Sequence, residues 1–190
     1  TPAFQTYAQR DGLAADYVTS VAFAPDGAVW IGTPRGATRV QDKYWITYTA
    51  AHGLGNAWVT GIAIVTADKI YLATNGGGLT FFDGATRKTH DTGNSAIPSN
   101  YLTAVAVDKA GRVWVGTLGA GVARLDGATW TKFSLANNYV NALALDATHV
   151  YALDARSGAI KWQNNSSGHL NAEARCGVGG VRIGHRRARI

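Results

Sequence analysis

The sequence predicts an all-β protein, a β-propeller of four blades with four strands each, and three observations lead to this prediction. A short motif recurs at intervals of 38–43 residues, and its copies begin at Tyr17, Trp58, Tyr101 and Tyr139. Several strand-length runs separated by glycine-containing turns fill each interval. Small and large side chains alternate in the first run of every copy. A period of about 40 residues with several short strands is typical of propeller blades.

Each repeat divides into four strand-length segments. In the first repeat, residues 18–23 and 29–33 are separated by a turn at residues 25–27. A glycine-containing loop leads to a third strand, such as residues 79–82 or 122–125, which ends at an Asp-Gly pair. Asp-Gly between apolar runs is a strong hairpin signal. The fourth strand carries aromatic residues, as at 45–48 and 130–133. The order of strands and turns predicts an antiparallel blade.

The first strand of each repeat has one face of small residues and one of large residues. In the first repeat Ser20 and Ala22 alternate with Val21 and Phe23, and the later copies follow the same pattern. Because successive side chains of a strand point to opposite faces, each blade presents a flat face and a bulky face. Bulky faces packed on flat faces would stack the blades.

The sequence leaves two ways to complete the ring. Residues 4–17 resemble residues 45–58, whereas the last repeat shows three strands and loses the pattern after residue 162. We therefore expect the N-terminal strand to complete the last blade, which would remove exposed strand edges in a monomer. The alternative is half of an eight-bladed ring, made by two chains that exchange this strand as a homodimer. In either case, residues 1–162 form the propeller, and residues 163–190 form a basic tail that is disordered or binds a partner.

Composition excludes several functional classes. The net charge is +6, but the five arginines and one glutamate of residues 163–190 give that segment +4, so the repeats carry no basic stripe of the kind that binds nucleic acid. No apolar run approaches the roughly 18 residues of a membrane-spanning helix. Cys176 is the single cysteine, so an internal disulfide is impossible.

The repeats resemble the two-component regulator propeller repeat. The resemblance lies in Gly53-Leu54, Asn100, residues 113–117, residues 76–78 followed by 82–84, and residues 45–48. It implies a periplasmic or extracellular sensor module, of a family in which many members are thought to sense carbohydrates. The same resemblance implies a bacterial protein that binds a ligand; the sequence favours no enzymatic activity and leaves a metal-dependent hydrolase as the alternative.

One end of the ring is the expected ligand-binding surface. The segments that enter each first strand and the loops between second and third strands meet at this end. They contribute one aromatic residue per blade, an amide or carboxylate beside it, and two arginines. The predicted ligand-binding residues are Asp16, Tyr17, Asn56, Trp58, Asn100, Tyr101, Asn138, Tyr139, Arg35, Asn75 and Arg156. Aromatic rings and amides in such a funnel suit a small polar molecule such as a carbohydrate. In the alternative interpretation, Asn and Asp at strand entries satisfy only turn backbone groups.

The same end gives a second functional hypothesis, a metal-dependent hydrolase of the lactonase or phosphotriesterase type. Oxygen atoms of Asp16, Asn100 and Asn138 could hold an axial calcium ion, because calcium prefers hard oxygen ligands. The scarcity of carboxylates in this set predicts weak binding. We therefore expect no cofactor other than such an ion.

Overall fold

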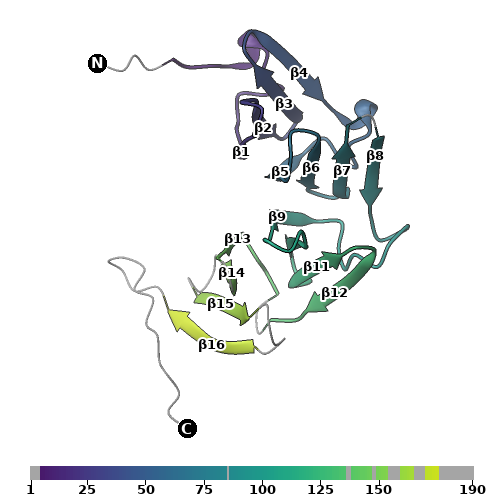
Figure 1. The fold of residues 1–190 in the computed structure, drawn as a ribbon, viewed down its shortest axis with the longest axis vertical. Helices are drawn as coiled ribbons and strands as arrows, with labels where there is room; N and C mark the ends of the chain where they lie inside the picture. Colours follow the sequence, from purple (N-terminus) through teal and green to yellow (C-terminus); the bar gives the residue numbers. More distant parts are fainter. Residues whose placement is uncertain are drawn as a thin grey trace.

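The computed structural model contains four antiparallel four-stranded sheets, which we call the first to fourth blades. The structure describes residues 5–84, 86–135, 138–146 and 149–153, together with the backbone of residues 159–164 and 170–175. Figure 1 shows that the blades follow one another along an open arc, with β1, β5, β9 and β13 on its inner side. Neighbouring inner strands contact each other along the arc. The predicted propeller blades are therefore confirmed.

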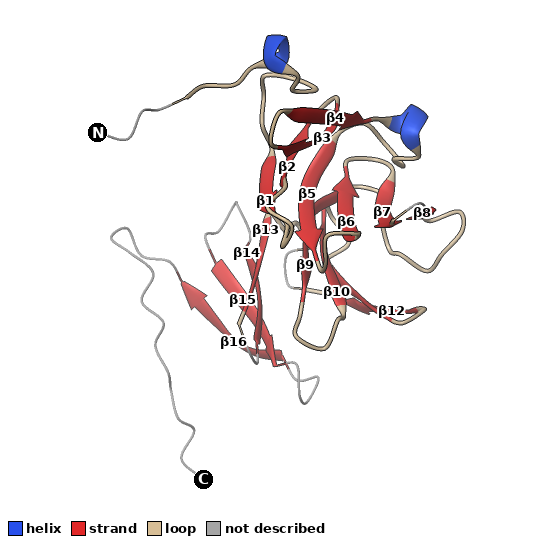
Figure 2. Ribbon diagram, turned by 45° about the horizontal axis from the view of Figure 1, so that its top comes forward, coloured by secondary structure: helices blue, strands red, loops and turns tan. Residues whose placement is uncertain are grey.

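Each blade runs from its innermost to its outermost strand in sequence order. The first blade contains β1 (Ser20–Phe23), β2 (Val29–Thr33), β3 (Gly36–Gln41) and β4 (Tyr44–Tyr48). The second contains β5 (Val59–Ile64), β6 (Lys69–Thr74), β7 (Gly78–Asp83) and β8 (Thr86–His90). The third contains β9 (Leu102–Val107), β10 (Val113–Thr117), β11 (Val122–Asp126) and β12 (Thr129–Phe133). The fourth contains β13 (Ala142–Leu145), β14 (His149–Leu153), β15 (Ala159–Asn164) and β16 (Leu170–Arg175). Two short 3-10 helices, η1 (Gln9–Asp11) and η2 (Ala50–His52), precede the first and second blades, as the turned view in Figure 2 shows.

The N-terminal strand does not complete the last blade, contrary to our expectation. Strand β16 pairs with β15 and fills the outer place of that sheet. The N-terminal segment lies against the first blade, where the Tyr7 and Trp45 ring centroids are 5.1 Å apart and the Ala14 amide donates to Thr38 Oγ1. These contacts hold it away from the fourth blade. Strand β16 also falls within residues 163–190, which the sequence analysis assigned to a tail; residues 165–169 and 176–190 lie outside the described residues.

The blades pack as the alternation of small and large residues predicts. Ile62 and Ile64 of β5 pack against the buried cluster that contains Trp30 of the first blade. The large residues of β9 and β13 pack in the same way at the next two boundaries. On the small-residue side, Gly61 lies so close to β9 that an added Cβ would be 3.1 Å from the Val105 nitrogen. Large-on-small packing therefore joins successive inner strands.

A side-chain hydrogen bond crosses every boundary beside this packing. Thr19 Oγ1 donates to the Val59 carbonyl at 2.6 Å, across the first boundary. Thr60 Oγ1 donates to the Leu102 carbonyl at 2.9 Å, and Thr103 Oγ1 to the Val140 carbonyl at 2.5 Å, across the second and third boundaries. We call this repeated contact the threonine clasp. Because its members are separated by 40, 42 and 37 residues, it ties one repeat to the next.

A carboxylate supports the buried aromatic residue of the third blade. Trp114 is fully buried, and its Nε1 donates to Asp108 Oδ2 at 2.9 Å; the Arg112 guanidinium donates to the same oxygen at 2.7 Å. In the fourth blade, the Tyr151 hydroxyl donates to Asp146 in the equivalent position, and this bond raises the pKa of Tyr151 to about 12. Each carboxylate thereby joins the turn after the first strand to the middle of the second.

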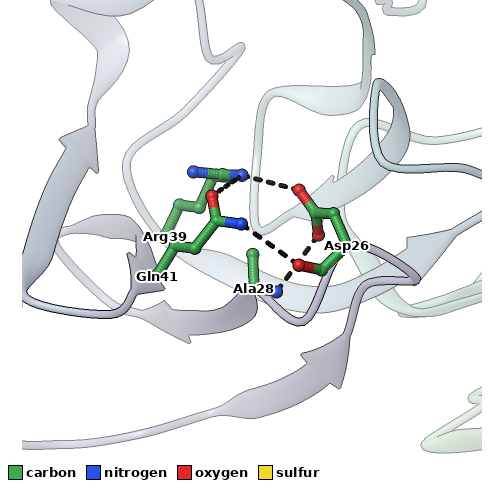
Figure 3. Close-up of polar contacts among 4 residues, drawn as sticks. All are labelled: Asp26, Ala28, Arg39 and Gln41. Atoms are coloured by element: carbon green, nitrogen blue, oxygen red, sulfur yellow. Dashed lines mark hydrogen bonds and ion pairs between the residues drawn. The ribbon is translucent and has the colours of Figure 1, made fainter.

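The first blade secures the same turn differently. Arg39 Nη2 on β3 donates to Asp26 Oδ2 at 2.7 Å and to Gln41 Oε1 at 2.6 Å (Figure 3). Gln41 Nε2 donates to the Asp26 carbonyl oxygen, and the Ala28 amide donates to Asp26 Oδ1. The amide of Ala28, and then the Arg39 guanidinium, hold the pKa of Asp26 below its usual value, although burial opposes them. The β1–β2 turn is thus fixed to the third strand.

The face of the first blade that is turned away from the second blade has no neighbouring blade among the described residues. Phe23 is 78 % exposed and Val18 is 42 % exposed, whereas Val59, Leu102 and Val140, which match Val18 in the later repeats, are at most 1 % exposed. This face therefore carries the residue types of a blade boundary without the burial that the other three boundaries provide.

We expect the threonine clasp to contribute measurably to stability. Thr103→Val keeps the shape of the side chain but leaves the Val140 carbonyl without its hydroxyl donor, so the free energy of unfolding should fall by about 1–2 kcal/mol. Urea unfolding followed by circular dichroism measures this loss. Thr129→Val, at an exposed position of β12, is the control and should change the free energy by less than about 0.5 kcal/mol. Equal losses for the two variants would contradict a role for the clasp.

The Asp108 carboxylate should make stability depend on acid. Burial alone would raise the pKa of Asp108, but hydrogen bonds from Trp114 and Arg112, together with the Arg112 charge, outweigh it and lower the pKa. Stability from this group is therefore complete above the unfolded pKa of about 3.9 and is lost as the pH falls through the lower folded pKa. In Asp108→Asn, the urea midpoint should be lower at pH 7 and should depend less on pH below about pH 4 than in the wild type. Asp126→Asn, at an exposed site, should keep the wild-type acid dependence.

Candidate functional site

The strand-entry segments and the glycine loops meet along the same side of the blades, at the boundaries between them. We call this side the loop end. The loop after the second strand of one blade reaches the residue that enters the first strand of the next. Asn75 forms a β-bridge with Tyr101, and Leu118 forms one with Tyr139. The Asn100 carbonyl accepts hydrogen bonds from the Gly76 and Gly78 amides, and the Asn138 carbonyl is used in the same way by the next loop. The loop end is therefore built across the blade boundaries.

The structure brings predicted residues of two blades together around Gly76. An added Cβ at Gly76 would lie 3.5 Å from Tyr101 Cε1 and 3.6 Å from Asn56 Nδ2. The backbone of Gly76 has φ of 99°, a conformation that glycine adopts at little cost. The backbone amide of Asn75 donates to the Trp58 carbonyl at 2.8 Å, which links the backbone of Trp58 to the same loop. Asn56, Trp58, Asn75 and Tyr101 thus form one cluster at the boundary of the second and third blades.

A close backbone approach positions Asn56 in this cluster. An added Cβ at Gly77 would lie 2.2 Å from the carbonyl carbon of Gly55 and 2.4 Å from the Asn56 nitrogen. The Gly55 amide also donates to Thr80 Oγ1 at 3.0 Å, which fixes this segment to β7. The run of glycines at residues 76–78 therefore admits the backbone that carries Asn56.

The side-chain oxygens at the strand entries are occupied by backbone amides. Asn56 Oδ1 accepts from the Trp58 amide, Asn100 Oδ1 from the Thr92 amide, and Asn138 Oδ1 from the Leu135 amide, each at 2.8 Å. Asp16 Oδ1 accepts from the Gln9 amide at 2.6 Å. These bonds are the turn contacts of the alternative interpretation. The Nδ2 donors of Asn56, Asn100 and Asn138 have no hydrogen-bond partner among the described residues.

The aromatic side chains of the loop end are open to solvent. Tyr17 is 70 % exposed, Tyr101 55 %, Trp58 45 % and Tyr139 41 %. Arg35 is also exposed, and only its backbone is held, by Thr33 Oγ1. Arg156 lies outside the described residues. The loop end therefore offers one exposed ring per blade, at equivalent positions along the arc.

The predicted calcium ligands come from separate local turns. Asp16, Asn100 and Asn138 each engage an amide within eight residues of their own position. Within the described part of the chain, no group of three His, Cys, Asp or Glu side chains is arranged to share a metal ion.

Sequence reasoning missed a cleft between the second and third blades. Its volume is about 380 Å³, and it is lined by aromatic side chains and by nitrogen and hydroxyl donors. The lining includes Tyr71, Phe81, Lys88, His90 and Trp130. Burial, and then the nearby Lys88 charge, lower the pKa of His90, while Asp91 opposes them. The available signal was the presence of Tyr71 and His90 at positions where the first and third repeats carry a tryptophan and a larger aromatic ring.

The fold and the loop end together define a β-propeller with sheets joined in an arc. The chain is similar to the extracellular domain of the hybrid two component system BT3049 from B. thetaiotaomicron, with a TM-score of 0.75, 16 % identity and coverage of 88 % of this chain and 26 % of that one. It is similar to the extracellular domain of BT4673 from B. thetaiotaomicron, with a TM-score of 0.71, 17 % identity and coverage of 87 % and 25 %. The virginiamycin B lyase of Staphylococcus aureus gives a TM-score of 0.69, 13 % identity and coverage of 87 % and 57 %. The chain thus spans about a quarter of the two regulator domains.

Family comparison identifies the repeat. Residues 12–35 and 96–119 match the model of the two component regulator propeller. These two segments match two-component regulator propeller repeats, and the resemblance drawn from the sequence is confirmed there. Both include a strand entry and reach the following glycine loop, so they contain loop-end residues. A search of curated protein sequences finds no match. Among the described residues, no helix is long and apolar enough to cross a membrane.

Replacement of Gly77 should disturb the cluster by steric conflict. Gly77→Ala would push the Gly55–Asn56 backbone away from the glycine loop, so the free energy of unfolding should fall by about 2–3 kcal/mol. Chemical denaturation measures the loss. Gly93→Ala is the matched control, because Gly93 lies in an exposed turn and meets only the Asp91 carboxylate at 3.1 Å; its loss should stay below about 1 kcal/mol. A small effect of Gly77→Ala would contradict the close approach.

Proposed function

We propose that this chain is a ligand-binding module of the sensor type, which acts outside the cytoplasm and binds a small polar molecule, such as a carbohydrate, at the loop end. The single observation that carries the proposal is the row of exposed rings at Tyr17, Trp58, Tyr101 and Tyr139, which are 41–70 % exposed although they are large and aromatic. None of the ring pairs among the described residues includes Tyr17, Trp58 or Tyr101, so a ligand could stack on the exposed faces of these three rings.

The chemistry of the loop end supports a polar ligand with apolar faces. Aromatic rings contact the flat C–H face of a sugar, and amide donors hold its hydroxyl groups. At the boundary of the second and third blades, Tyr101 and Asn56 Nδ2 flank the same glycine. This pair supplies one ring and one unpartnered donor within the reach of a single sugar unit.

The expected location follows from the proteins that share the fold. The regulator structures similar to this chain are described as the extracellular domains of a hybrid two component system and of a one component system. The matched repeats carry the two component regulator description as well. A periplasmic or extracellular sensing role is therefore the proposal that agrees with both comparisons.

Ligand binding should depend on the loop-end rings and not on exposed rings elsewhere. In a calorimetric screen against neutral and acidic oligosaccharides, we expect at least one to bind the wild type. Trp58→Ala and Tyr101→Ala should weaken that binding by about tenfold or more, because each loses a stacking surface. Their free energies of unfolding should change by less than about 1 kcal/mol, because both side chains are exposed.

Tyr44→Ala is the matched control. Tyr44 is 63 % exposed and lies on the outer strand β4, so this variant should bind as the wild type does. Equal weakening in all three variants, or no binding of any oligosaccharide by the wild type, would refute the assignment of a carbohydrate to the loop end.

A further inference from the structure

Equivalent clefts lie at two blade boundaries and differ in size. Between the first and second blades, a cleft of about 200 Å³ is lined by residues that include Trp30, Tyr48 and Arg87. Between the second and third blades, the corresponding cleft has about 380 Å³ and is lined by the residues in the same places, Tyr71, His90 and Trp130. The second cleft reaches the volume range of small-molecule sites, which begins at about 300 Å³.

A change of stacking partner opens the larger cleft. In the first blade, Trp30 stacks on Tyr48 with ring centroids 5.2 Å apart and planes 17° apart. In the third blade, Trp114 stacks on Phe133 in the same way, at 5.4 Å and 26°. In the second blade, the smaller Tyr71 stacks instead on Phe81, at 4.6 Å and 24°. The space that a tryptophan fills beside the fourth strand in the other two blades is therefore open beside His90.

Several of the side chains that line the larger cleft carry hydrogen-bond donors. The Lys88 ammonium, the Tyr71 hydroxyl and the Trp130 Nε1 have no hydrogen-bond partner among the described residues, and Trp130 Nε1 is buried. No carboxylate is found among the described residues of the lining. The neighbouring Asp91 carboxylate accepts from the Gly93 amide and from Asn94 Nδ2, so it is engaged in its own turn. Outside the lining, the Asp83 carboxylate lies near enough to Tyr71 that burial, and then the Asp83 charge, raise the pKa of the Tyr71 hydroxyl. Within the lining, the positive charge of Lys88 and the unpartnered donors favour an anion.

The walls of the cleft add a flat apolar surface. The Trp130 ring lies edge-on to His90, with centroids 5.9 Å apart and planes 72° apart, and the stacked Tyr71–Phe81 pair forms part of the lining. Because burial lowers the pKa of His90, its ring is neutral near pH 7, which leaves Lys88 as the charge in the lining. A ligand that uses both features has a negative group joined to a flat ring.

We propose that this cleft binds a small organic carboxylate with a flat ring, whose carboxylate is held by Lys88 and the Trp130 Nε1 donor and whose ring packs against the aromatic walls. This site is separate from the loop end and does not depend on the function proposed there.

Benzoate is a suitable probe, and benzamide is its neutral counterpart of the same shape. In ¹H–¹⁵N spectra of the full chain, benzoate should shift the indole signal of Trp130, assigned by its loss in Trp130→Phe. The expected dissociation constant is about 1–5 mM for a ligand of this size. Benzamide should bind at least about tenfold more weakly, because it lacks the charge that pairs with Lys88.

Two variants test the assignment without removing the fold. Lys88→Met should weaken benzoate binding by about tenfold and leave benzamide binding unchanged, whereas Lys132→Met, at an exposed position of β12, should have no effect. The double variant Tyr71→Trp with His90→Phe copies the Trp114–Phe133 pair of the third blade, so it should fold, fill the cleft and lose benzoate binding. Equal affinities for benzoate and benzamide, or full benzoate binding by Lys88→Met or by the filled variant, would overturn the proposal.

Discussion

The threonine clasp and the packing beside it position every other feature of the arc. The accepting carbonyls belong to Val59, Leu102 and Val140, and the residue before each of them carries a loop-end ring. Side chains at these accepting positions pack where the preceding blade is small; an added Cβ at Gly116 would lie 2.7 Å from Val140 Cγ1. A bond that fixes the accepting backbone therefore fixes the start of the strand and the ring in front of it. The loop end follows from the way in which the blades are joined.

The strands were predictable because their signals are local. Alternation of small and large residues identifies β5 and β9, and the motif at residues 113–117 corresponds to strand β10. Ring closure was not predictable, because the likeness of residues 4–17 to 45–58 has another cause. Helices η1 and η2 each end at a glycine with positive φ, Gly12 or Gly53, and the next residue, Leu13 or Leu54, is buried. The repeated segment thus encodes a tight turn with a buried leucine, and it need not form a strand. Strand β16 lacks the aromatic residues that marked the fourth strands of the first and third repeats.

Repeat equivalence predicts which residues share the loop end, but it does not reveal which of their atoms remain available. Asn56, Asn100 and Asn138 occupy related positions, and in each the amide oxygen is used by the backbone while the Nδ2 group has no partner among the described residues. An oxygen-based metal site and a donor-based ligand site look the same in sequence. They differ once hydrogen bonds are assigned, because occupied oxygens weaken the case for a cation and unpartnered donors support a polar ligand. The unpartnered donors therefore support the proposed ligand-binding role, and the hydrolase hypothesis stays a prediction from the sequence.

The larger cleft arises because a blade boundary has two parts with different tolerances. Near the inner strands, a Cβ added at Gly116 would meet the next blade closer than van der Waals contact, so residue size is restricted there. Toward the outer strands, the same backbone accepts a Trp30–Tyr48 stack in one blade and a Tyr71–Phe81 stack in another. The inner contacts keep the blades in register, so an outer aromatic residue can change its partner without separating them. A scaffold of repeated blades can therefore form, at one boundary, a cavity that differs from those at the other boundaries. The chemistry of that cavity depends on residues that the repeat does not constrain.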